Sequence, residues 1–528
     1  MLRYRRLAGL VAAGVLAVAC TGGSSKPSAT ESSRGSRDGG TLRLGIERLT
    51  SLDPADASPG SQSQLLAADL LFDGLTTVPA GSDVPQPALA SKWSSSADQK
   101  VWTFTLRPDA KFSNGRTITA DDVKFSLERV AKQGESTVPG IRLEVITGYA
   151  AFVGGSQPAI AGIKVVAPDT LEIDLDNPLA VLPALLAAPS YGVVPKEAVA
   201  AASPVFKGAP VGSGPFAYAG TEGDVLKLVR ASSSSAHLDA VELHEYTDLA
   251  ASYADFTAGK LDWSLVPTAQ VDDALGRYGD AAFRPFHAEL FYAINALDPT
   301  FADPRFRQAI IKAVDRTALV KAVYPGVADP LGGVVPAGVA GHTDDPCGAP
   351  CSYDPDGARA LLGQAFPEVQ VPTVNIDYED SPDNAAVAGA IEADLNVIGI
   401  PTVKRPHPAD QYAQFAVSGQ QGLFQFGWVG LYDDPDAYLA PLFVSNSRDN
   451  ATGFADAPFD ALIVQSRGTA DAAARVALDR QAEQRALGLA PVLPIAQFRT
   501  RAVVSKKVHD LNVSVDGTFA AEDVTIDH

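Results

Sequence analysis

The chain contains few residue patterns that could carry out catalysis or bind a metal. Residues 212–214 are Gly-Ser-Gly, but they lack the outer spacing of the nucleophile elbow that exposes a catalytic serine. Residues 259–260 are Gly-Lys without the earlier glycine and the following Ser or Thr of a phosphate-binding loop. His244 precedes Glu245, but Asp248 stands where a zinc-binding helix needs its second histidine. The seven histidines are otherwise scattered, so we expect no catalytic residue, no metal site and no cofactor.

Two cysteines in the body of the chain can bond to each other. Cys347 and Cys351 are separated by Gly-Ala-Pro, and we interpret them as a local disulfide that closes a tight loop in an exported protein. Closing so short a loop contributes only about 2 kcal/mol to stability in the chain-entropy model. A redox pair and a metal pair are the alternatives. Both are weaker, because redox pairs have two intervening residues and no further metal ligands lie nearby.

The first forty residues have the layout of an export signal followed by a tether. Three arginines precede an apolar run at residues 7–19, which is too short to span a bilayer of roughly 30 Å as a helix. With Cys20 directly after this run, the layout resembles a bacterial lipoprotein signal, although Ala17 stands where Leu is usual. We expect a signal peptide at 1–19, a lipidated Cys20 and a flexible tether over 20–40. A plainly secreted protein with an incidental Cys20 is the alternative.

Composition limits both the partners and the architecture. The formal net charge is −20, and an acidic surface disfavours nucleic acid and other polyanions. Roughly 490 residues follow the tether, more than one hydrophobic core usually covers, so two or three lobes are expected. Hydrophobic residues make up 46% of the chain, but no later apolar run approaches 18 residues. We therefore expect a globular body without a membrane-spanning helix.

Strands and helices alternate along this body. The spacing of Trp102, Phe104 and Leu106 predicts a half-buried strand over 101–106. Other strands are predicted at residues 41–46, 163–166, 171–175, 371–378 and 423–429. Helices are predicted at residues 62–72, from a cap at Thr119 to 130, from a cap at Asp303 to about 324, and at 385–398 and 470–487. This mixture predicts α/β lobes around mixed sheets.

Several blocks of sequence, taken in order, resemble the solute-binding proteins of peptide ABC importers. This is the oligopeptide, dipeptide and nickel-binding family, extracellular solute-binding protein family 5. The most specific block spans residues 102–129, from Trp-Thr-Phe-Thr-Leu-Arg to Val-Lys-Phe-Ser-Leu-Glu-Arg. Shorter matching blocks lie at residues 40–46, 52–55, 72–75, 212–216, 303–316, 353–362, 427–428 and 434–435.

The resemblance implies an α/β fold of two lobes that close on a ligand, a type II periplasmic-binding-protein-like clamp. Lobe one would be residues 41–290 with an extra subdomain at about 80–210, lobe two residues 291–497, and residues 498–528 would return to lobe one. The hinge strands would be residues 291–295 and 494–498. A ligand shifts such a clamp towards its closed form only through its differential affinity for that form.

The same resemblance points to ligand-binding residues at the end of the strand predicted at 423–429. Trp428 stands where the family places a tryptophan facing the cleft, although the alternation of aromatic residues here also suits a core position. Gly427, Val429 and Gly430 would offer main-chain groups to a peptide. Each such hydrogen bond contributes about 0.5 to 1.5 kcal/mol whatever the side chains of the peptide are.

Further candidates come from the hinge strands and from the segment after the tryptophan. Asn295 and Phe498 lie in one proposed hinge strand each, and ordinary hinge packing is the alternative for both. Asp433 and Asp434 could meet a cation of the ligand. However, Asp434 followed by proline also suits a helix N-cap.

Position 431 departs from the family pattern. In oligopeptide and dipeptide binders an aspartate three residues after this tryptophan pairs with the α-ammonium of the peptide, whereas this chain has Leu431. An ammonium buried without a partner costs several kcal/mol. Either Asp433 or Asp434 replaces that aspartate, or the amino end stays solvated or blocked. We expect the second arrangement, in which N-acetylated and free peptides bind within a factor of about ten.

The implied function is capture of short peptides by a monomeric, non-enzymatic, lipid-anchored component of an ABC importer. It would work on the extracytoplasmic face of the cell membrane, with permease subunits as partners. Two alternatives remain. One is the same clamp with another cargo, such as haem, a metal chelate or a sugar oligomer; the other is an extracellular, lipid-anchored hydrolase.

Overall fold

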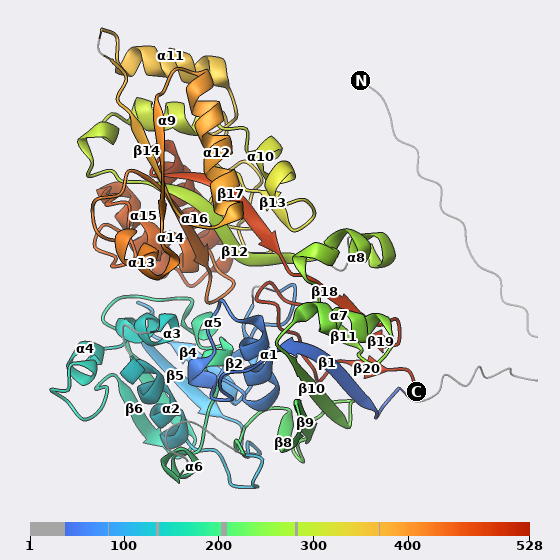
Figure 1. Cartoon of the computed structure of the whole chain (residues 1–528). Helices are drawn as coiled ribbons and strands as arrows, with labels where there is room; N and C mark the ends of the chain where they lie inside the picture. The colour runs from blue at the N-terminus through green and yellow to red at the C-terminus, as the bar shows by residue number, and fades with distance from the viewer. Residues whose placement is uncertain (1–36, 83, 134–136, 202–208, 280–282, 369) are drawn as a thin grey trace, which may run out of the picture. The chain divides into compact units, whose positions relative to one another are not determined.

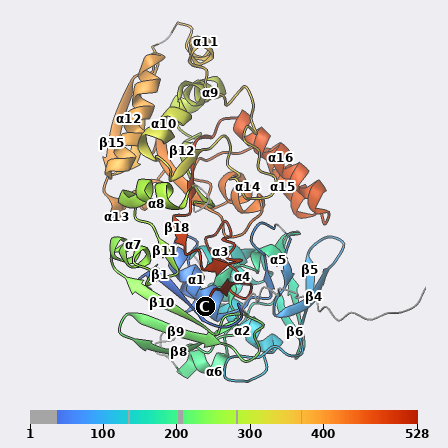
Figure 2. The same cartoon turned by 90° about the vertical axis from the view of Figure 1, so that its right-hand side faces the viewer.

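Three larger sheets and two short ribbons organise the described residues of the chain in its computed structural model (Figures 1 and 2). The structure describes residues 37–528 except 83, 134–136, 202–208, 280–282 and 369. The predicted signal peptide, Cys20 and most of the predicted tether lie outside the described residues. No helix within the described ranges is long and apolar enough to cross a membrane.

Sheet A combines the first strand with strands from later in the chain, in the order β18-β11-β1-β10-β9-β8. Its strands are β1 (Thr41–Glu47), β8 (Phe216–Glu222), β9 (Val225–Arg230), β10 (Ala240–Tyr246), β11 (Trp263–Leu265) and β18 (Ala502–Val504). Leu42, Leu44 and Ile46 of β1 are fully buried, as the predicted strand requires. The accompanying elements are α1 (Gln62–Leu71), α7 (Leu249–Thr257), α8 (Val271–Tyr278) and the ribbon of β19 (Val508–His509) and β20 (Thr525–Ile526).

Sheet B is antiparallel, in the order β4-β5-β7-β6. Its strands are β4 (Ala90–Ser95), β5 (Val101–Leu106), β6 (Ile163–Ala167) and β7 (Thr170–Asp174). The predicted alternation in β5 is confirmed, since Trp102, Phe104 and Leu106 are all buried. α2 packs on β6 and β7, and its first turn is fixed by Asp122, which accepts 2.9 Å hydrogen bonds from the N–H and hydroxyl of Thr119. Neighbouring elements are β2 (Thr76–Thr77), β3 (Gln86–Pro87), α2 (Ala120–Gln133), α3 (Val138–Arg142), α4 (Tyr149–Val153), α5 (Leu182–Leu185) and α6 (Lys196–Ala201).

Sheet C is mixed, in the order β13-β17-β12-β16-β14-β15. Its strands are β12 (Pro285–Ile294), β13 (Ala328–Pro330), β14 (Val374–Glu379), β15 (Thr402–His407), β16 (Leu423–Val429) and β17 (Val492–Arg499). Its helices are α9 (Pro304–Ala313), α10 (Arg316–Val323), α11 (Pro355–Ala365), α12 (Pro382–Val397), α13 (Ala409–Phe415), α14 (Asp436–Phe443), α15 (Ala457–Arg467) and α16 (Ala472–Gly488). α12 packs on β14 and β15, while α14, α15 and α16 pack on one another (Figure 1).

The chain passes between sheets A and C at two adjacent points. β12 begins at Pro285, which pairs with Arg499 near the end of β17. One residue further out, the N–H of Thr500 donates to the carbonyl of Arg284 at 2.7 Å, and the N–H of Arg284 donates to the Thr500 hydroxyl at 3.1 Å. The two crossing segments are therefore hydrogen-bonded to each other.

The predicted single helix over 304–324 is wrong, because α9 and α10 are separate. Val314 adopts an extended conformation, with φ −91° and ψ 119°. The Asp315 carboxylate then accepts a hydrogen bond from the N–H of Ala318 at 2.9 Å and caps α10. The apolar spacing continues through this break, which is why the sequence pattern did not show it.

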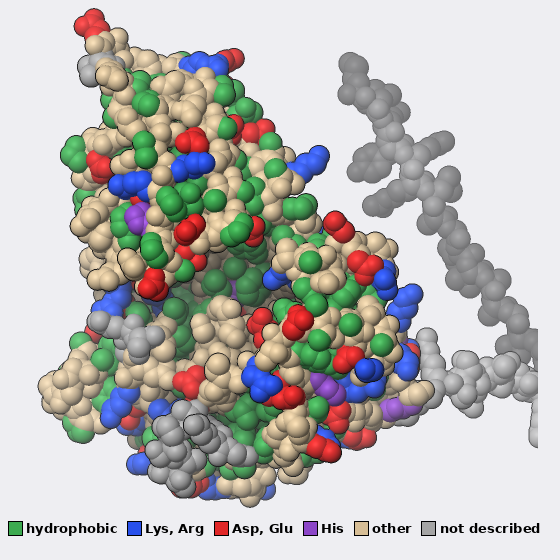
Figure 3. Space-filling model, viewed as in Figure 1, with side chains coloured by type: hydrophobic (Ala, Val, Ile, Leu, Met, Phe, Trp, Pro, Cys, Tyr) green, Lys and Arg blue, Asp and Glu red, His purple; other side chains and the backbone are tan. Residues whose placement is uncertain are grey.

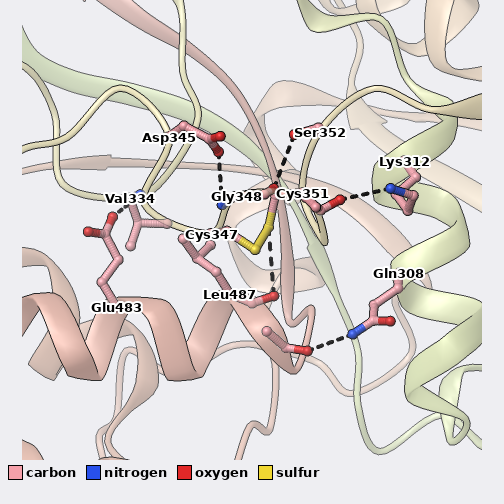
Figure 4. Close-up of a disulfide and its surroundings, with 12 residues drawn as sticks. Gln308, Lys312, Val334, Asp345, Cys347, Gly348, Cys351, Ser352, Glu483 and Leu487 are labelled. Atoms are coloured by element: carbon pink, nitrogen blue, oxygen red, sulfur yellow. Dashed lines mark hydrogen bonds between the residues drawn. A yellow bond between two sulfur atoms is a disulfide. The ribbon is translucent and has the colours of Figure 1, made fainter.

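The disulfide between Cys347 and Cys351 is present, with the Cα atoms 5.6 Å apart (Figure 4). Inside the loop, the N–H of Cys351 donates to the carbonyl of Gly348 at 3.0 Å. The ammonium group of Lys312 on α9 donates to the carbonyl of Ala349 at 2.8 Å. The bonded loop is thereby attached to the helix layer of sheet C.

Candidate ligand-binding site

The segment after β16 forms a wall of two neighbouring cavities. Leu431, Tyr432 and Asp433 line cavity 1, which has a volume of about 420 Å³. Tyr432 also lines cavity 2, of about 660 Å³. The remaining walls come largely from elements around sheets A and B, so both cavities join segments that are far apart in the sequence. Figure 3 shows one face of the molecule, which is hollowed over hydrophobic side chains.

Most of the charged side chains that line cavity 1 are acidic. Six of the lining side chains are carboxylates and one is a guanidinium, that of Arg107. The carboxylates belong to Asp69, Asp73, Asp433, Asp516, Glu522 and Asp523. Arg107 already pairs with Asp73, at 3.3 Å. The cavity therefore has more carboxyl groups than its own cation can pair with.

Burial raises the pKa of several of these carboxyl groups. The pKa of Asp69 lies well above its usual range, and the neighbouring charges of Asp516, Glu522 and Asp73 add to the effect of burial. Burial also raises the pKa of Asp73 to about 7, with Glu522 adding to the shift and Arg107 opposing it. The pKa of Glu522 is raised by burial as well. A positive charge placed among these groups would stabilise their ionised forms.

Cavity 2 has a mixed charge pattern with a small excess of cations. Three guanidinium groups and two carboxyl groups line it, those of Arg142, Arg448, Arg467, Glu144 and Asp176. Arg448 lies 3.8 Å from Glu144. Arg467 forms two bonds of 2.5 and 2.9 Å with Asp436 at the start of α14. Arg142 on α3 pairs with Asp449 at 2.7 Å. The Tyr432 hydroxyl donates to Asp436 at 2.7 Å, which fixes the side chain shared by the two cavities.

Trp428 lies beside the arginines rather than in a cavity wall. Its ring is half-buried, and Nε1 donates to the carbonyl of Ala437 on α14 at 2.8 Å. The guanidinium of Arg142 lies 5.4 Å from the ring centroid, a cation-π arrangement. The ring therefore contacts a residue that lines cavity 2, although it is not among the lining residues itself.

The neighbouring main chain at 427–430 packs closely against β12. A Cβ atom on Gly427 would lie 2.8 Å from the carbonyl oxygen of Glu289, and one on Gly430 would collide with the hydroxyl of Tyr438. Val429 is half-buried and pairs with Ala288 of β12. Close packing thus explains why glycine stands at positions 427 and 430. That residues 427, 429 and 430 contact the ligand stays a prediction.

Asn295 and Phe498 do not line either cavity. The amide of Asn295 donates to the carbonyl of Gln421 at 3.0 Å, and its oxygen accepts from the N–H of Leu297 at 3.0 Å. Asn295 lies at the end of β12 that is opposite the start of β16, away from residue 428. Phe498 packs edge-on against Tyr324, with the ring centroids 5.4 Å apart. Their binding roles stay predictions, and their contacts are those of packing.

Asp433 and Asp434 face different surroundings. Asp434 is 3% exposed and accepts a hydrogen bond from the N–H of Asp436 at 3.0 Å and one from Arg475 at 3.1 Å. Asp433 lines cavity 1, and burial raises its pKa while the nearby His287 lowers it. Only Asp433 of the two is therefore placed to meet a ligand cation.

Sequence reasoning missed the carboxylates of cavity 1 outside the 431–434 segment. Asp69 lies on α1, and Glu522 lies in the final segment of the chain. The chain has 62 acidic residues, so no pair of them stood out. Asp73 lies beyond the end of α1, after the extended residue Phe72, so no helical spacing links it to Asp69.

Comparisons with known proteins match nearly the whole chain. The profile of the bacterial extracellular solute-binding proteins, family 5, matches residues 84–450. The dipeptide-binding protein DppE of Bacillus subtilis is 29% identical over 478 residues, covering 85% of this chain and 83% of that protein. The dipeptide-binding protein of Escherichia coli is 27% identical over 527 residues, covering 92% and 96%. Among solved structures, the murein tripeptide binding protein MppA in its unliganded open form superposes with a TM-score of 0.81. It is 23% identical, and the superposition covers 92% of this chain and 98% of MppA.

Proposed function

This chain belongs to the bacterial extracellular solute-binding proteins of family 5, and from that premise we propose that it captures short peptides for an ABC importer. Proteins of this family bind solutes outside the cytoplasm and are not catalytic, and the fold is the two-lobed α/β fold of its structural neighbours. The peptide would be held between the two lobes and handed to permease subunits in the membrane.

The lobes of this proposal follow the sheets. Lobe one contains sheets A and B, and lobe two contains sheet C. The hinge lies where Pro285 pairs with Arg499 and where Arg284 and Thr500 are hydrogen-bonded. This proposed hinge is a few residues outside the segments 291–295 and 494–498, which stay predictions. Rotation about these two adjacent crossings would open and close the space that holds both cavities.

The unequal charge of the two cavities, acidic in cavity 1 and with a small excess of cations in cavity 2, is the observation that carries the peptide proposal. A short peptide has an ammonium group at one end and a carboxylate at the other. Cavity 1 is lined by an excess of carboxyl groups, cavity 2 by three guanidinium groups and two carboxyl groups, and Tyr432 lines both. The three guanidinium groups also have carboxylate partners within the protein. A peptide whose amino end enters cavity 1 and whose carboxyl end enters cavity 2 would therefore find complementary charge at both ends.

Asp433 is the residue that we propose for the α-ammonium in place of the family's aspartate, whose position is Leu431 here. This proposal replaces the expectation of an unpaired amino end, because Asp433 lines cavity 1 while Asp434 is bonded to Arg475. Leu431 would contribute apolar contact in the same wall. Trp428 would act by holding Arg142 in the wall of cavity 2.

The anchoring is proposed on the sequence alone. Lipidation of Cys20 would hold a monomeric body on the outer face of the cell membrane through the tether. Cys20→Ala should release the folded protein from the membrane fraction. A variant that stays membrane-bound to the same extent would exclude this anchor.

Native mass spectrometry of protein purified without refolding tests the cargo directly, because a closed clamp retains ligand through purification. A ladder of masses that fragment as short peptides is the expected result. One discrete non-peptide mass, such as that of haem, would replace peptides by another cargo. New fragments on incubation with a peptide mixture would favour the hydrolase instead.

A further inference from the structure

Contacts between protein groups join the two lobes beside cavity 2. The guanidinium of Arg142, the last residue of α3 in lobe one, pairs with the carboxylate of Asp449 in lobe two at 2.7 Å. The same guanidinium lies 5.4 Å from the ring centroid of Trp428, near the end of β16. Next to Asp449 in the sequence, Arg448 lies 3.8 Å from Glu144. The end of α3 therefore meets two separate segments of lobe two.

A second pair of segments meets along the same cavity. The N–H of Ala180, in the loop before α5 of lobe one, donates to the carbonyl of Arg467 at the end of α15 at 2.8 Å. A Cβ atom on Gly468 would lie 3.9 Å from Cβ of Pro178, so the two loops are in van der Waals contact. Arg142 and Arg467 both line cavity 2. The contacts between the lobes are thus gathered at one wall of this cavity.

Both ends of the ion pair between Arg142 and Asp449 are attached to the bodies of their own lobes. In lobe one, the hydroxyl of the buried Tyr191 donates to the carbonyl of Pro139 in α3 at 2.9 Å. In lobe two, the side-chain amide of Asn450 donates to the carbonyl of Phe454 at 2.7 Å. The pair therefore restrains one lobe relative to the other, because neither partner lies on a loop that lacks attachment to its own lobe.

Asp449 has no other visible task. The side chains of Arg142 and Asp449 are 14% and 22% exposed, so solvent screens their attraction less than at the open surface. Within the ranges that the structure describes, the Asp449 carboxylate accepts a hydrogen bond only from Arg142. Asp449 lines neither cavity. Its effect on the lobes can therefore be measured separately from any contact with ligand.

We propose that the ion pair between Arg142 and Asp449 is a latch that holds lobe one against lobe two in the empty protein, so that Asp449 raises ligand affinity without touching the ligand. This inference rests on the proposed capture of ligand between the lobes. The apparent association constant is the intrinsic constant multiplied by the fraction of molecules in the binding-competent arrangement. Contacts that hold the lobes together before binding raise this fraction and reduce the ordering that the ligand must bring about. Asp449 is thus a positioning residue that acts through Arg142.

Small-angle X-ray scattering of the ligand-free protein tests the latch itself. Asp449→Asn removes the charge and keeps the size of the side chain, so the radius of gyration should increase. Asp449→Glu keeps the charge and should leave the radius unchanged. Arg142→Gln should increase the radius as well. Combining it with Asp449→Asn should give no further increase, because both substitutions remove the same contact.

Calorimetry with alanine peptides of two to five residues tests the consequence for binding. Asp449→Asn should weaken binding of the best of these peptides by about fivefold or more, whereas Asp449→Glu should weaken it by less than about twofold. Glu392→Gln is the matched control, because Glu392 forms an ion pair with Lys404 at 3.1 Å inside lobe two and lines neither cavity. Neither its radius of gyration nor its affinity should change.

Three results would overturn the inference. An unchanged radius of gyration in Asp449→Asn and in Arg142→Gln, with a melting transition that shows folded protein, would mean that the pair does not hold the lobes. Unchanged affinity despite a larger radius would remove Asp449 from ligand binding. Tighter binding by Asp449→Asn would mean that the pair holds the lobes in an arrangement that opposes binding. If no alanine peptide binds the unmodified protein while the radius increases as expected, the latch is supported and the peptide function is contradicted.

Discussion

Asp433 and Asp436 lie three positions apart, yet their carboxylates do different things. Asp436 is 2% exposed and holds Arg467 and the hydroxyl of Tyr432. Although burial opposes ionisation, these partners lower its pKa below the usual range. Asp433 lines cavity 1, and its carboxylate lies 3.8 Å from Nδ1 of His287. We therefore assign stability to Asp436 and ligand binding to Asp433.

Replacing each residue by asparagine separates the two roles. Asp436→Asn should reduce the free energy of unfolding by about 3 to 5 kcal/mol at pH 7, because Arg467 is left without its partner. A lowered pKa stabilises the folded state above the unfolded value of 3.8, so this loss should shrink as the pH falls below about 4. Urea unfolding at pH 7 and pH 3.5 measures both effects.

Asp433→Asn is the matched variant. Its free energy of unfolding should stay the same or increase, while its affinity for a free-amine peptide should fall about tenfold or more in calorimetry. If Asp433→Asn unfolded as readily as Asp436→Asn, the assignment of Asp433 to the ligand would be wrong.

At the scale of single residues, the sequence pointed to a segment that contributes to the wall of cavity 1, but not to the orientation of its side chains. The predicted residues of the segment 427–434 include Leu431 and Asp433, which line cavity 1, but not Tyr432, which lines it as well. It could not distinguish Asp433 from Asp434, because adjacent side chains point in directions that depend on the packing of the loop. Asp69 was missed because its environment comes from segments that are distant in the sequence.

At the scale of elements, α16 carries an unusual buried acidic stripe. Asp479 and Glu483 lie one turn apart and are each 1% exposed. Burial, reinforced by Asp434, raises the pKa of Asp479 to about 8. Burial raises the pKa of Glu483 to about 6. The N–H groups of Val334 and Val335 donate hydrogen bonds to its carboxylate and so oppose this rise.

The stripe predicts a pH-dependent stability. A carboxyl group with a raised pKa stays protonated in the folded state while the unfolded chain has already lost its proton, so stability falls as the pH rises from about 4 to 8. Asp479→Asn removes one such group. Its free energy of unfolding relative to the unmodified protein should increase by about 1 to 3 kcal/mol between pH 5 and pH 8. A difference that does not change with pH would show that Asp479 does not titrate in this range.

The disulfide loop is the second element with a defined consequence. Removing the bond with Cys347→Ser and Cys351→Ser should lower the free energy of unfolding by about 2 kcal/mol, the entropy of a short loop. Peptide affinity should not change, because the loop is attached to α9 and lines neither cavity. Chemical unfolding and calorimetry of the same variant measure the two quantities. A loss of affinity would mean that the loop positions the site.

Elements were predictable where the signal was local. The alternation in β5 and the spacing of the two cysteines each depend on a few adjacent residues, and both predictions are confirmed. The break between α9 and α10 was not predictable from apolar spacing, because Val314 keeps the helical period while its backbone is extended. At this point Asp315 caps the start of α10, so a new helix begins although the apolar spacing continues.

At the scale of the whole molecule, the proposal concerns two lobes joined at one hinge. Some contacts already link the lobes: Arg142 with Asp449, and the N–H of Ala180 with the carbonyl of Arg467 at 2.8 Å. A peptide that joins the carboxylates of cavity 1 to the arginines of cavity 2 would add further contacts between the lobes. Its binding energy would thus be greater in the closed form, which is the condition for a ligand to shift the equilibrium.

The most direct test is small-angle X-ray scattering of the protein with and without a saturating short peptide. The account predicts that the radius of gyration decreases on binding, and that the melting temperature of the same sample rises with peptide concentration. A scattering profile that stays unchanged while calorimetry shows the peptide bound would contradict capture between two closing lobes.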